Sequence, residues 1–183
     1  MTPLETALVE ITSFLKGKKI PYMVIGGIAN IFWGIPRATV DIDITVMVPD
    51  ENIENFVSQI RKKFRLLVSN PAAFIKKTRV LPIQTKMKHP IDLIFGQLPF
   101  EEEAIRRSLP EKIGNKSVRI CSPEDLIIHK IISQRGQDLE DVKGIIQNQK
   151  RKLNRKYLDP IIKNLSKEMD RSDILDFYKN CLK

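Results

Sequence analysis

Two aspartates separated by a single residue have the clearest chemical potential in this sequence. Asp41 and Asp43 flank Ile42 and lead into a β-branched stretch that predicts a strand. Alternate residues of a strand share a face, so the two carboxylates would lie roughly 6.5–7 Å apart at their Cα atoms. They would repel each other without a cation between them, and the candidates are Arg37 and Mg²⁺. The pair is therefore placed to share or bridge divalent metal ions.

Two consecutive glycines precede this strand. Gly26 and Gly27 follow the apolar run 22–25, which predicts a short buried strand, and they allow a tight turn close to a ligand. A short helix is expected over residues 30–34. Backbone N–H groups at a helix start favour phosphate, although a simple packing turn is the alternative. Asn30, one turn into this helix, could contact phosphate or sugar, or could be a solvated side chain.

Arg37 and Thr39 fall on the same face as the aspartates by parity, if the strand begins early enough. The planar guanidinium of Arg37 suits both carboxylate and phosphate, so it could hold the aspartates in place or bind the ligand. A purely structural ion pair is equally compatible with the sequence. Thr39 would support the same face.

This arrangement of glycine turn, short helix and Asp-x-Asp strand resembles the nucleotidyltransferase superfamily of the DNA polymerase β type. The longer string G-G-x-A…G-x-P-R-x-T-x-D-I-D is similar to that of AbiEii-type and MenT-type toxin nucleotidyltransferases. Their pattern includes a third carboxylate on a later strand, and Asp92, in the predicted strand 91–95, supplies one. Considered alone, such an aspartate could equally pair with an arginine or cap a turn.

The resemblance implies roles for these residues. It implies that Asp41, Asp43 and Asp92 bind two Mg²⁺ ions and that Asp92 can also act as the base on an acceptor hydroxyl. It implies that Gly26 and Gly27 hold the triphosphate of an NTP.

A second charged group lies in the C-terminal part of the chain. Lys130, Arg135, Asp138 and Asp141 resemble the K…R-x-x-D-x-x-D string that follows the core in the toxin families, where a lysine and an aspartate are needed for activity. The resemblance implies that all four bind nucleotide and that Lys130 is catalytic. The alternatives are a snorkelling lysine and an ion-paired helix junction, with Asp138 as an N-cap.

Composition limits the class of protein. The chain has 183 residues, 42% of them hydrophobic, and a net charge of +9 with a pI near 9.6. Such a charge favours a polyanionic partner, nucleic acid before membrane, although mere solubility is the alternative. Its two cysteines fit neither a disulfide framework nor a metal-ligand spacing, the N-terminus is unlike a signal peptide, and no apolar stretch is long enough for a bilayer. We expect a soluble, cytoplasmic protein.

The predicted fold is α/β (α+β). It comprises a polymerase-β-like nucleotidyltransferase core with a mixed sheet flanked by helices over residues 1–121, and a helical C-terminal part over residues 122–183. The periodicity predicts helices at 3–16, after 49–51, and at 99–107, 122–135, 138–147, 158–167 and 172–182. It predicts an extended hairpin arm over 74–85 and strands over 91–95 and 116–121.

Together these features predict an enzyme that transfers NMP from an NTP to an acceptor hydroxyl and releases pyrophosphate. The charge makes tRNA the leading acceptor, and the resemblance implies a toxin-like role with a possible cognate antitoxin. One alternative is modification of a protein or a small molecule. The other is a catalytically silent member that binds RNA or a partner protein.

Overall fold

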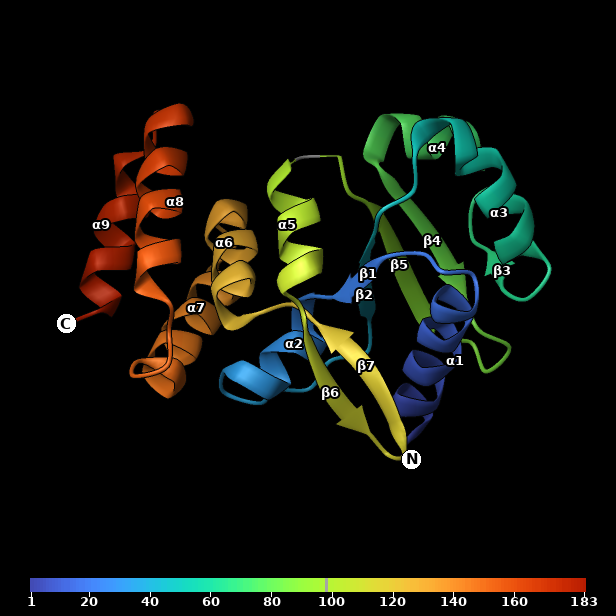
Figure 1. Cartoon of the computed structure of the whole chain (residues 1–183), viewed down its shortest axis with the longest axis horizontal. Helices are drawn as coiled ribbons and strands as arrows, with labels where there is room; N and C mark the ends of the chain where they lie inside the picture. Colours follow the sequence, from blue (N-terminus) through green and yellow to red (C-terminus); the bar gives the residue numbers. More distant parts are fainter. Residues whose placement is uncertain (98) are drawn as a thin grey trace. The chain divides into compact units, whose positions relative to one another are not determined.

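A mixed β-sheet forms the centre of the first part of the chain (Figure 1). The computed structural model describes residues 1–97 and 99–183. The strands within these ranges are β1 (Tyr22–Val24), β2 (Ile42–Val46), β3 (Arg65–Leu66), β4 (Val80–Gln84), β5 (Pro90–Phe95), β6 (Leu109–Ile113) and β7 (Lys116–Ile120). They form one sheet in the order β3-β4-β5-β2-β1-β7-β6. The pairs β2–β5 and β1–β7 are parallel and the others antiparallel, as expected for a mixed sheet.

Helices precede, interrupt and follow these strands. They are α1 (Pro3–Gly17), α2 (Gly26–Trp33), the 3₁₀ turn η1 (Asp50–Asn52), α3 (Ile53–Arg61), α4 (Pro71–Thr78), α5 (Pro99–Arg107), α6 (Pro123–Ser133), α7 (Gly136–Gln149), α8 (Arg155–Glu168) and α9 (Ser172–Cys181). Local capping explains where several of them begin. Thr2 and Glu5 form a reciprocal capping box at α1, and Ser122 accepts a hydrogen bond from the Asp125 amide at α6.

The two faces of the sheet differ in character. On β2, Ile42, Ile44 and Val46 are fully buried, and their register partners on β5 present apolar side chains to the same core. Phe95 of β5 meets Phe56 of α3 edge-on, with ring centroids 5.8 Å apart. The alternation of side chains along a strand sends Asp43 to the opposite face, so this aspartate lies on a strand that is anchored by its apolar side.

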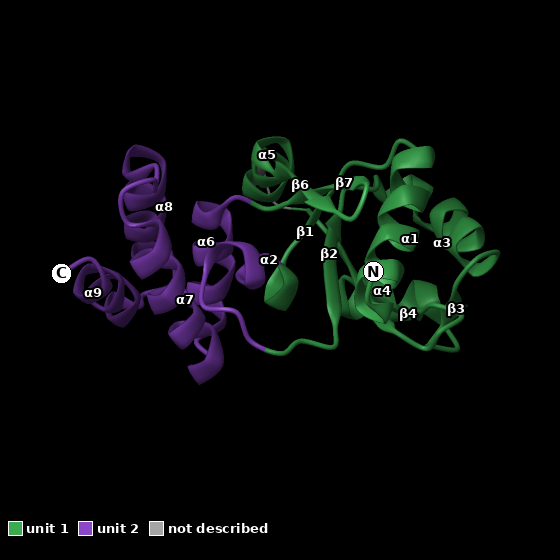
Figure 2. Ribbon diagram, turned by 90° about the horizontal axis from the view of Figure 1, so that it is seen from below, with its two compact units in different colours: residues 1–28, 38–121 green, residues 29–37, 122–183 purple. Residues whose placement is uncertain are grey.

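The described residues group into two compact units, coloured green and purple in Figure 2. Unit 1 comprises residues 1–28 and 38–121 and contains the whole sheet. Unit 2 comprises residues 29–37 and 122–183, so it takes in most of α2 as well as α6 to α9. Because residues 29–37 group with the C-terminal helices, the chain enters unit 2 between the glycine pair and the aspartates. The division at residue 121 into core and helical part stays a prediction.

Most of the predicted elements are present, but two predictions were wrong. Residues 74–85 are not a hairpin arm: α4 runs to Thr78 and is followed by β4. Asn70 accepts a hydrogen bond from the Ala73 amide and Pro71 occupies the first helical turn, so capping starts a helix that weak periodicity concealed. Strand β6 was missed, and α2 begins at Gly26 rather than near Asn30.

Candidate active site in unit 1

The turn at Gly26 brings the backbone directly beneath Asp43. Gly26 has φ of +66°, which a residue with a side chain adopts only at a cost, and it begins α2. A Cβ atom placed on Gly26 would lie 2.0 Å from Oδ2 of Asp43. The amide of Ile25 donates to the carbonyl of Asp43 over 2.9 Å, which fixes the two segments together. Both the conformation and the space at position 26 therefore require glycine.

Gly27 is close-packed for a separate reason. A Cβ atom at this position would lie 2.5 Å from Oγ1 and 2.9 Å from Cβ of Thr39. The Thr39 hydroxyl also donates to the Asp41 carbonyl over 3.4 Å. Thr39 thus lies between the glycine turn and the peptide that carries the first aspartate. The glycine pair and the acidic strand form one closely fitted assembly within unit 1.

Asp43 and Asp92 occupy paired positions on neighbouring strands. They are register partners in the parallel pair β2–β5, so their side chains leave the sheet on the same face, with strands about 4.8 Å apart. Burial raises the pKa of the Asp92 carboxyl, and the negative charge of Asp41 raises it further. Asp41 is therefore close enough to Asp92 for the two carboxylates to interact.

The expected position of Asp41 needs correction. Strand β2 begins at Ile42, so Arg37, Thr39 and Asp41 precede the strand and do not follow its alternation. The Asp41 side chain is exposed. Among the described residues, no group of three or more histidine, cysteine, aspartate or glutamate side chains is close enough to form a metal site.

The donor set nevertheless fits Mg²⁺. All three side chains are carboxylates, the oxygen ligands that a hard divalent cation prefers. Two are held in register by the sheet, and the third precedes β2 by one residue, outside its regular hydrogen bonding. Burial raises the pKa of Asp92 most and the charge of Asp41 adds to it, and a bound cation would offset this second contribution.

The second predicted group forms a buried ion-pair network in unit 2. The Lys130 ammonium is only 5% exposed and donates to Oδ1 of Asp138 over 2.8 Å and to Oδ2 of Asp141 over 2.7 Å. Asp138 also accepts from Ser133 over 2.5 Å and from the exposed Arg135 over 2.6 Å. Burial alone raises the pKa of both carboxyls, but hydrogen bonds to the surrounding cations outweigh it and lower each pKa below its usual range.

Arg37 belongs to this network, which no pattern in the sequence indicated. Its Nε donates to Oδ1 of Asp141 over 3.0 Å and its Nη2 to Oδ2 over 2.9 Å, a two-pronged contact between residues 104 positions apart. Arg37 was expected on the face of the aspartates, whereas these contacts lie within unit 2. Asp138 is also not an N-cap, because α7 begins at Gly136 and Asp138 lies in its first turn.

Asn30 is fully buried in the part of α2 that belongs to unit 2. Its side-chain nitrogen donates to the carbonyl of Ile35 over 3.0 Å, and its oxygen lies against Gly34, 2.3 Å from where a Cβ would be. The side chain therefore closes the loop that ends α2. It is not the solvated residue that was one alternative.

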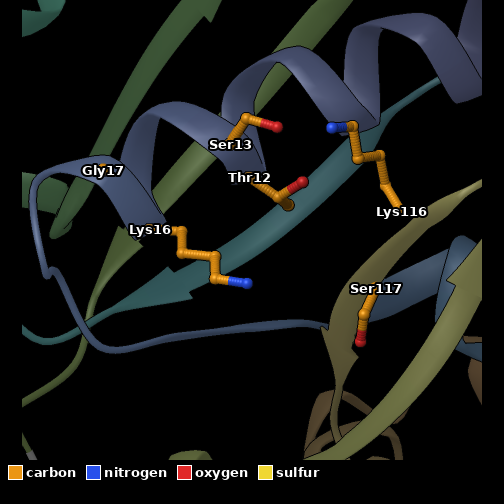
Figure 3. A pocket seen from close by; sticks show the side chains of 6 residues that line it. All are labelled: Thr12, Ser13, Lys16, Gly17, Lys116 and Ser117. Carbon is orange, nitrogen blue, oxygen red and sulfur yellow. The ribbon is translucent and has the colours of Figure 1, made fainter.

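A separate cleft of about 310 Å³ opens elsewhere in unit 1. Thr12, Ser13, Lys16 and Gly17 of α1 and Lys116 and Ser117 of β7 line it (Figure 3). None of the predicted site residues contributes to this cleft. Lys16 lies in the last turn of α1, where a cation offsets the partial negative charge of the helix carbonyls, so its presence has a structural explanation.

The mixed sheet, with a glycine turn packed beneath an Asp-x-Asp strand, has the polymerase β-like nucleotidyltransferase fold. The chain belongs to the family described as nucleotidyl transferase of unknown function (DUF2204), which matches residues 4–176. It is therefore an enzyme of the nucleotidyltransferase class. No protein of curated description is significantly similar to it in sequence.

Solved structures support the same fold at low sequence identity. The chain is similar to the antibiotic-resistance factor ANT(2'')-Ia, with TM-score 0.61 and 16% identity over 92% of this chain and 94% of that one. It is also similar to an antigenic nucleotidyltransferase-like protein from Paracoccidioides brasiliensis, with TM-score 0.57 and 19% identity over 96% and 92%. The lincosamide antibiotic adenylyltransferase LnuA gives TM-score 0.53 and 12% identity over 79% and 96%.

Within the described part of the chain, no helix is both long and apolar enough to cross a membrane.

Proposed function

We propose that the protein transfers NMP from a Mg²⁺-bound NTP to an acceptor hydroxyl and releases pyrophosphate. The observation that carries the proposal is the pairing of Asp43 with Asp92 on adjacent parallel strands, with the Gly26 turn packed directly beneath Asp43. Phosphate groups favour a glycine turn at a helix start, because its backbone N–H groups and the helix dipole are positive there. Carboxylates beside such a turn suit a substrate that carries its own divalent cations.

Asp41, Asp43 and Asp92 would hold two Mg²⁺ ions, which supply neutralising charge for the triphosphate when bound. Gly26 and Gly27 would bind the β- and γ-phosphates through their amides. Asp92 has a second task in the proposal: it would act as the general base on the attacking hydroxyl, as the motif resemblance implies.

The remaining predicted nucleotide contacts belong to the same proposal. Thr39 packs on Gly27 and could contact phosphate from there. A nucleotide contact by Asn30, Arg37, Arg135, Asp138, Asp141 or Lys130, and a catalytic role for Lys130, stay predictions. For Lys130, any such contact would compete with the two carboxylates that already accept its hydrogen bonds.

RNA is the proposed acceptor, with tRNA as the leading candidate. The net charge of +9 supports it, because a polyanion gains affinity from counterion release on a basic protein. A small-molecule acceptor is the second candidate, favoured by the similarity in size and fold to ANT(2'')-Ia and LnuA, antibiotic-modifying enzymes by name. A toxin-like role and a cognate antitoxin rest on the motif resemblance alone, and growth arrest on expression, relieved by Asp43→Asn, would test them.

Transfer of an α-labelled nucleotide tests the chemistry and the acceptor together. Each NTP is incubated with the protein, Mg²⁺ and total RNA, with Asp43→Asn as the inactive variant. Asp173→Asn is the matched control, because it removes a surface aspartate whose ion pair, with Arg171, is exposed. We expect labelled RNA that disappears with EDTA and with Asp43→Asn but persists with Asp173→Asn.

The other outcomes are informative. Label on protein, or on an added aminoglycoside but not on RNA, would refute the RNA acceptor and retain the reaction. Equal label with Asp43→Asn and the unmodified protein would refute the assignment of the site. RNA binding that is insensitive to salt would also argue against the charge-based acceptor.

A further inference from the structure

The segment between the glycine turn and the acidic strand is held by side chains of α7. Asn148 donates to the carbonyl of Gly34 over 2.8 Å, and Gln149 donates to the carbonyl of Trp33 over 3.1 Å. A Cβ atom on Gly144 would lie 3.0 Å from Cγ1 of Ile35, so α7 and the loop touch at a glycine. All these residues belong to unit 2, together with residues 29–37.

The strongest of these attachments is the network of Arg37, Asp141 and Lys130. Asp141 is 4% exposed and accepts the two-pronged contact from Arg37 on one side and the Lys130 ammonium on the other. Lys130 is shared with Asp138, so its position is set by two carboxylates. Buried charges of this kind tolerate few alternative arrangements, because any that leaves one charge unpaired is costly.

The attached segment has a particular place in the chain. It continues α2, whose first two residues are Gly26 and Gly27, and a helix transmits displacement along its length because its hydrogen bonds are internal. At its other end, Arg37 precedes Asp41 by four residues. A change in the position of residues 29–37 therefore acts covalently on the phosphate-binding turn and on the first predicted metal ligand.

We propose that Arg37, Asp141 and Lys130 are positioning residues: they clamp segment 29–37 to α7 and thereby set the Gly26–Gly27 turn and Asp41 for nucleotidyl transfer. The proposal rests on the proposed function for the reaction that it serves. In this interpretation Lys130 does not contact the triphosphate; it holds the carboxylate that holds Arg37.

The geometry favours positioning over direct phosphate binding. Lys130 is 5% exposed and gives hydrogen bonds to two carboxylates. Arg37 is 34% exposed, and its Nε and Nη2 are both engaged by Asp141. A triphosphate would have to displace a buried carboxylate from Lys130, whereas the clamp uses the contacts as they stand.

The chain supplies its own reporter of the clamp. Trp33, the single tryptophan, lies inside the segment, and its carbonyl accepts a hydrogen bond from Gln149. The quenching of its fluorescence by acrylamide can be measured on the folded protein without any ligand. We would compare Arg37→Gln, Arg37→Lys, Asp141→Asn and Lys130→Met with Glu140→Gln. The last is the matched control, because Glu140 is on α7 and its ion pair, with Lys143, is exposed.

The clamp predicts stronger quenching of Trp33 in all four variants and unchanged quenching in Glu140→Gln. It predicts a fall in transfer rate at saturating NTP of about tenfold or more, since displacements near 1 Å at a reacting group have effects of up to ~100-fold. Arg37→Lys is decisive, because it keeps the charge but loses the planar fork. Loss of the two-pronged contact would loosen the segment and increase the quenching of Trp33, whereas a phosphate contact by Arg37 predicts unchanged quenching in the ligand-free protein.

Several results would overturn the proposal. Unchanged Trp33 quenching in Arg37→Gln and Arg37→Lys would show that the network does not hold the segment. Because Arg37 is partly exposed, these two variants should fold, so the test stands even if Asp141→Asn or Lys130→Met fails to fold. Stronger quenching with a full transfer rate would refute the positioning role. A higher KM for NTP with an unchanged maximal rate and unchanged quenching would indicate direct phosphate contact. If the unmodified protein transfers no nucleotide, the proposed function fails, and with it the positioning role; quenching would then test only the clamp.

Discussion

Substitution of Gly26 by alanine separates two properties of the glycine turn. The backbone there has φ of +66°, and the added Cβ would lie 2.0 Å from Oδ2 and 2.8 Å from Cγ of Asp43. The first property affects stability and the second affects the position of a proposed metal ligand. A single change therefore has a thermodynamic effect and a chemical one, which can be measured apart.

Both effects have estimable sizes. Holding a residue with a side chain in the left-handed region costs about 1–2 kcal/mol. For a protein of this length that cost lowers Tm by roughly 2–8 °C. Restoring normal contact with the new methyl group requires the Asp43 carboxylate to move by more than 1 Å, and displacements of about that size at a reacting centre reduce rates by roughly 100-fold.

The assay measures pyrophosphate release and thermal unfolding on three alanine variants. Gly114→Ala is the control for backbone strain, because Gly114 has φ of +59° and the side chain nearest to its added Cβ is the flexible one of Met1. Gly17→Ala is the control for the substitution itself, because nothing lies within 4 Å of its Cβ. We expect Gly26→Ala and Gly114→Ala to lose similar stability, and only Gly26→Ala to lose activity.

A Gly26→Ala protein that unfolds like Gly114→Ala but releases pyrophosphate within about threefold of the unmodified rate would refute this reasoning, given the ~100-fold expectation. The close approach of residue 26 to Asp43 would then have no catalytic consequence. Loss of activity in Gly114→Ala as well would show that general strain, not the carboxylate, is responsible.

Three further changes test other parts of the site. The folded-state pKa of Asp92 is raised above its unfolded value, so the stability that this carboxyl contributes is lost as pH rises through the folded pKa. At pH 7 we therefore expect Asp92→Asn to raise the Tm of the metal-free protein. The same variant should abolish the stabilisation by Mg²⁺ and NTP. The pKa of Asp141 is lowered, so the stability that it contributes is present above the unfolded pKa near 3.9 and is lost as pH falls through the folded pKa. Asp141→Asn should lower the free energy of unfolding, measured by denaturant titration, by about 3–5 kcal/mol at pH 7 and by little in acid. A cost that does not change with pH would contradict this. Gly27→Ala should reduce activity, and adding Thr39→Gly should recover part of it, because Thr39 is what the new Cβ would meet; no recovery would mean that another contact is responsible.

Local signals made part of this structure predictable. The glycine pair was placed at a tight turn because its sequence follows an apolar strand, and the acidic strand was recognised from its alternation and β-branched residues. The match of Asp92 to the same site came from resemblance. Its physical basis, the parallel pairing of β2 with β5, depends on contacts between distant strands that no local pattern encodes.

The incorrect expectation for Arg37 also arises from contacts between distant parts of the chain. Arg37 was assigned by strand parity, but the strand begins at Ile42, and the partner that decides its position is Asp141, more than a hundred residues away. The buried environment of Lys130 likewise depends on packing between α6 and α7. Long-range ion pairs of this kind are specified by the assembled fold, so sequence reasoning could name the members but not the pairs.

The two edges of the sheet have a consequence for partner binding. At one edge β3 has only two residues; at the other, β6 contains Pro110, which has no amide hydrogen, followed by charged Glu111 and Lys112. Short, proline-containing and charged edges resist the addition of a foreign strand. A protein that recognises unit 1 would therefore be expected to bind through side-chain surfaces rather than by extending the sheet.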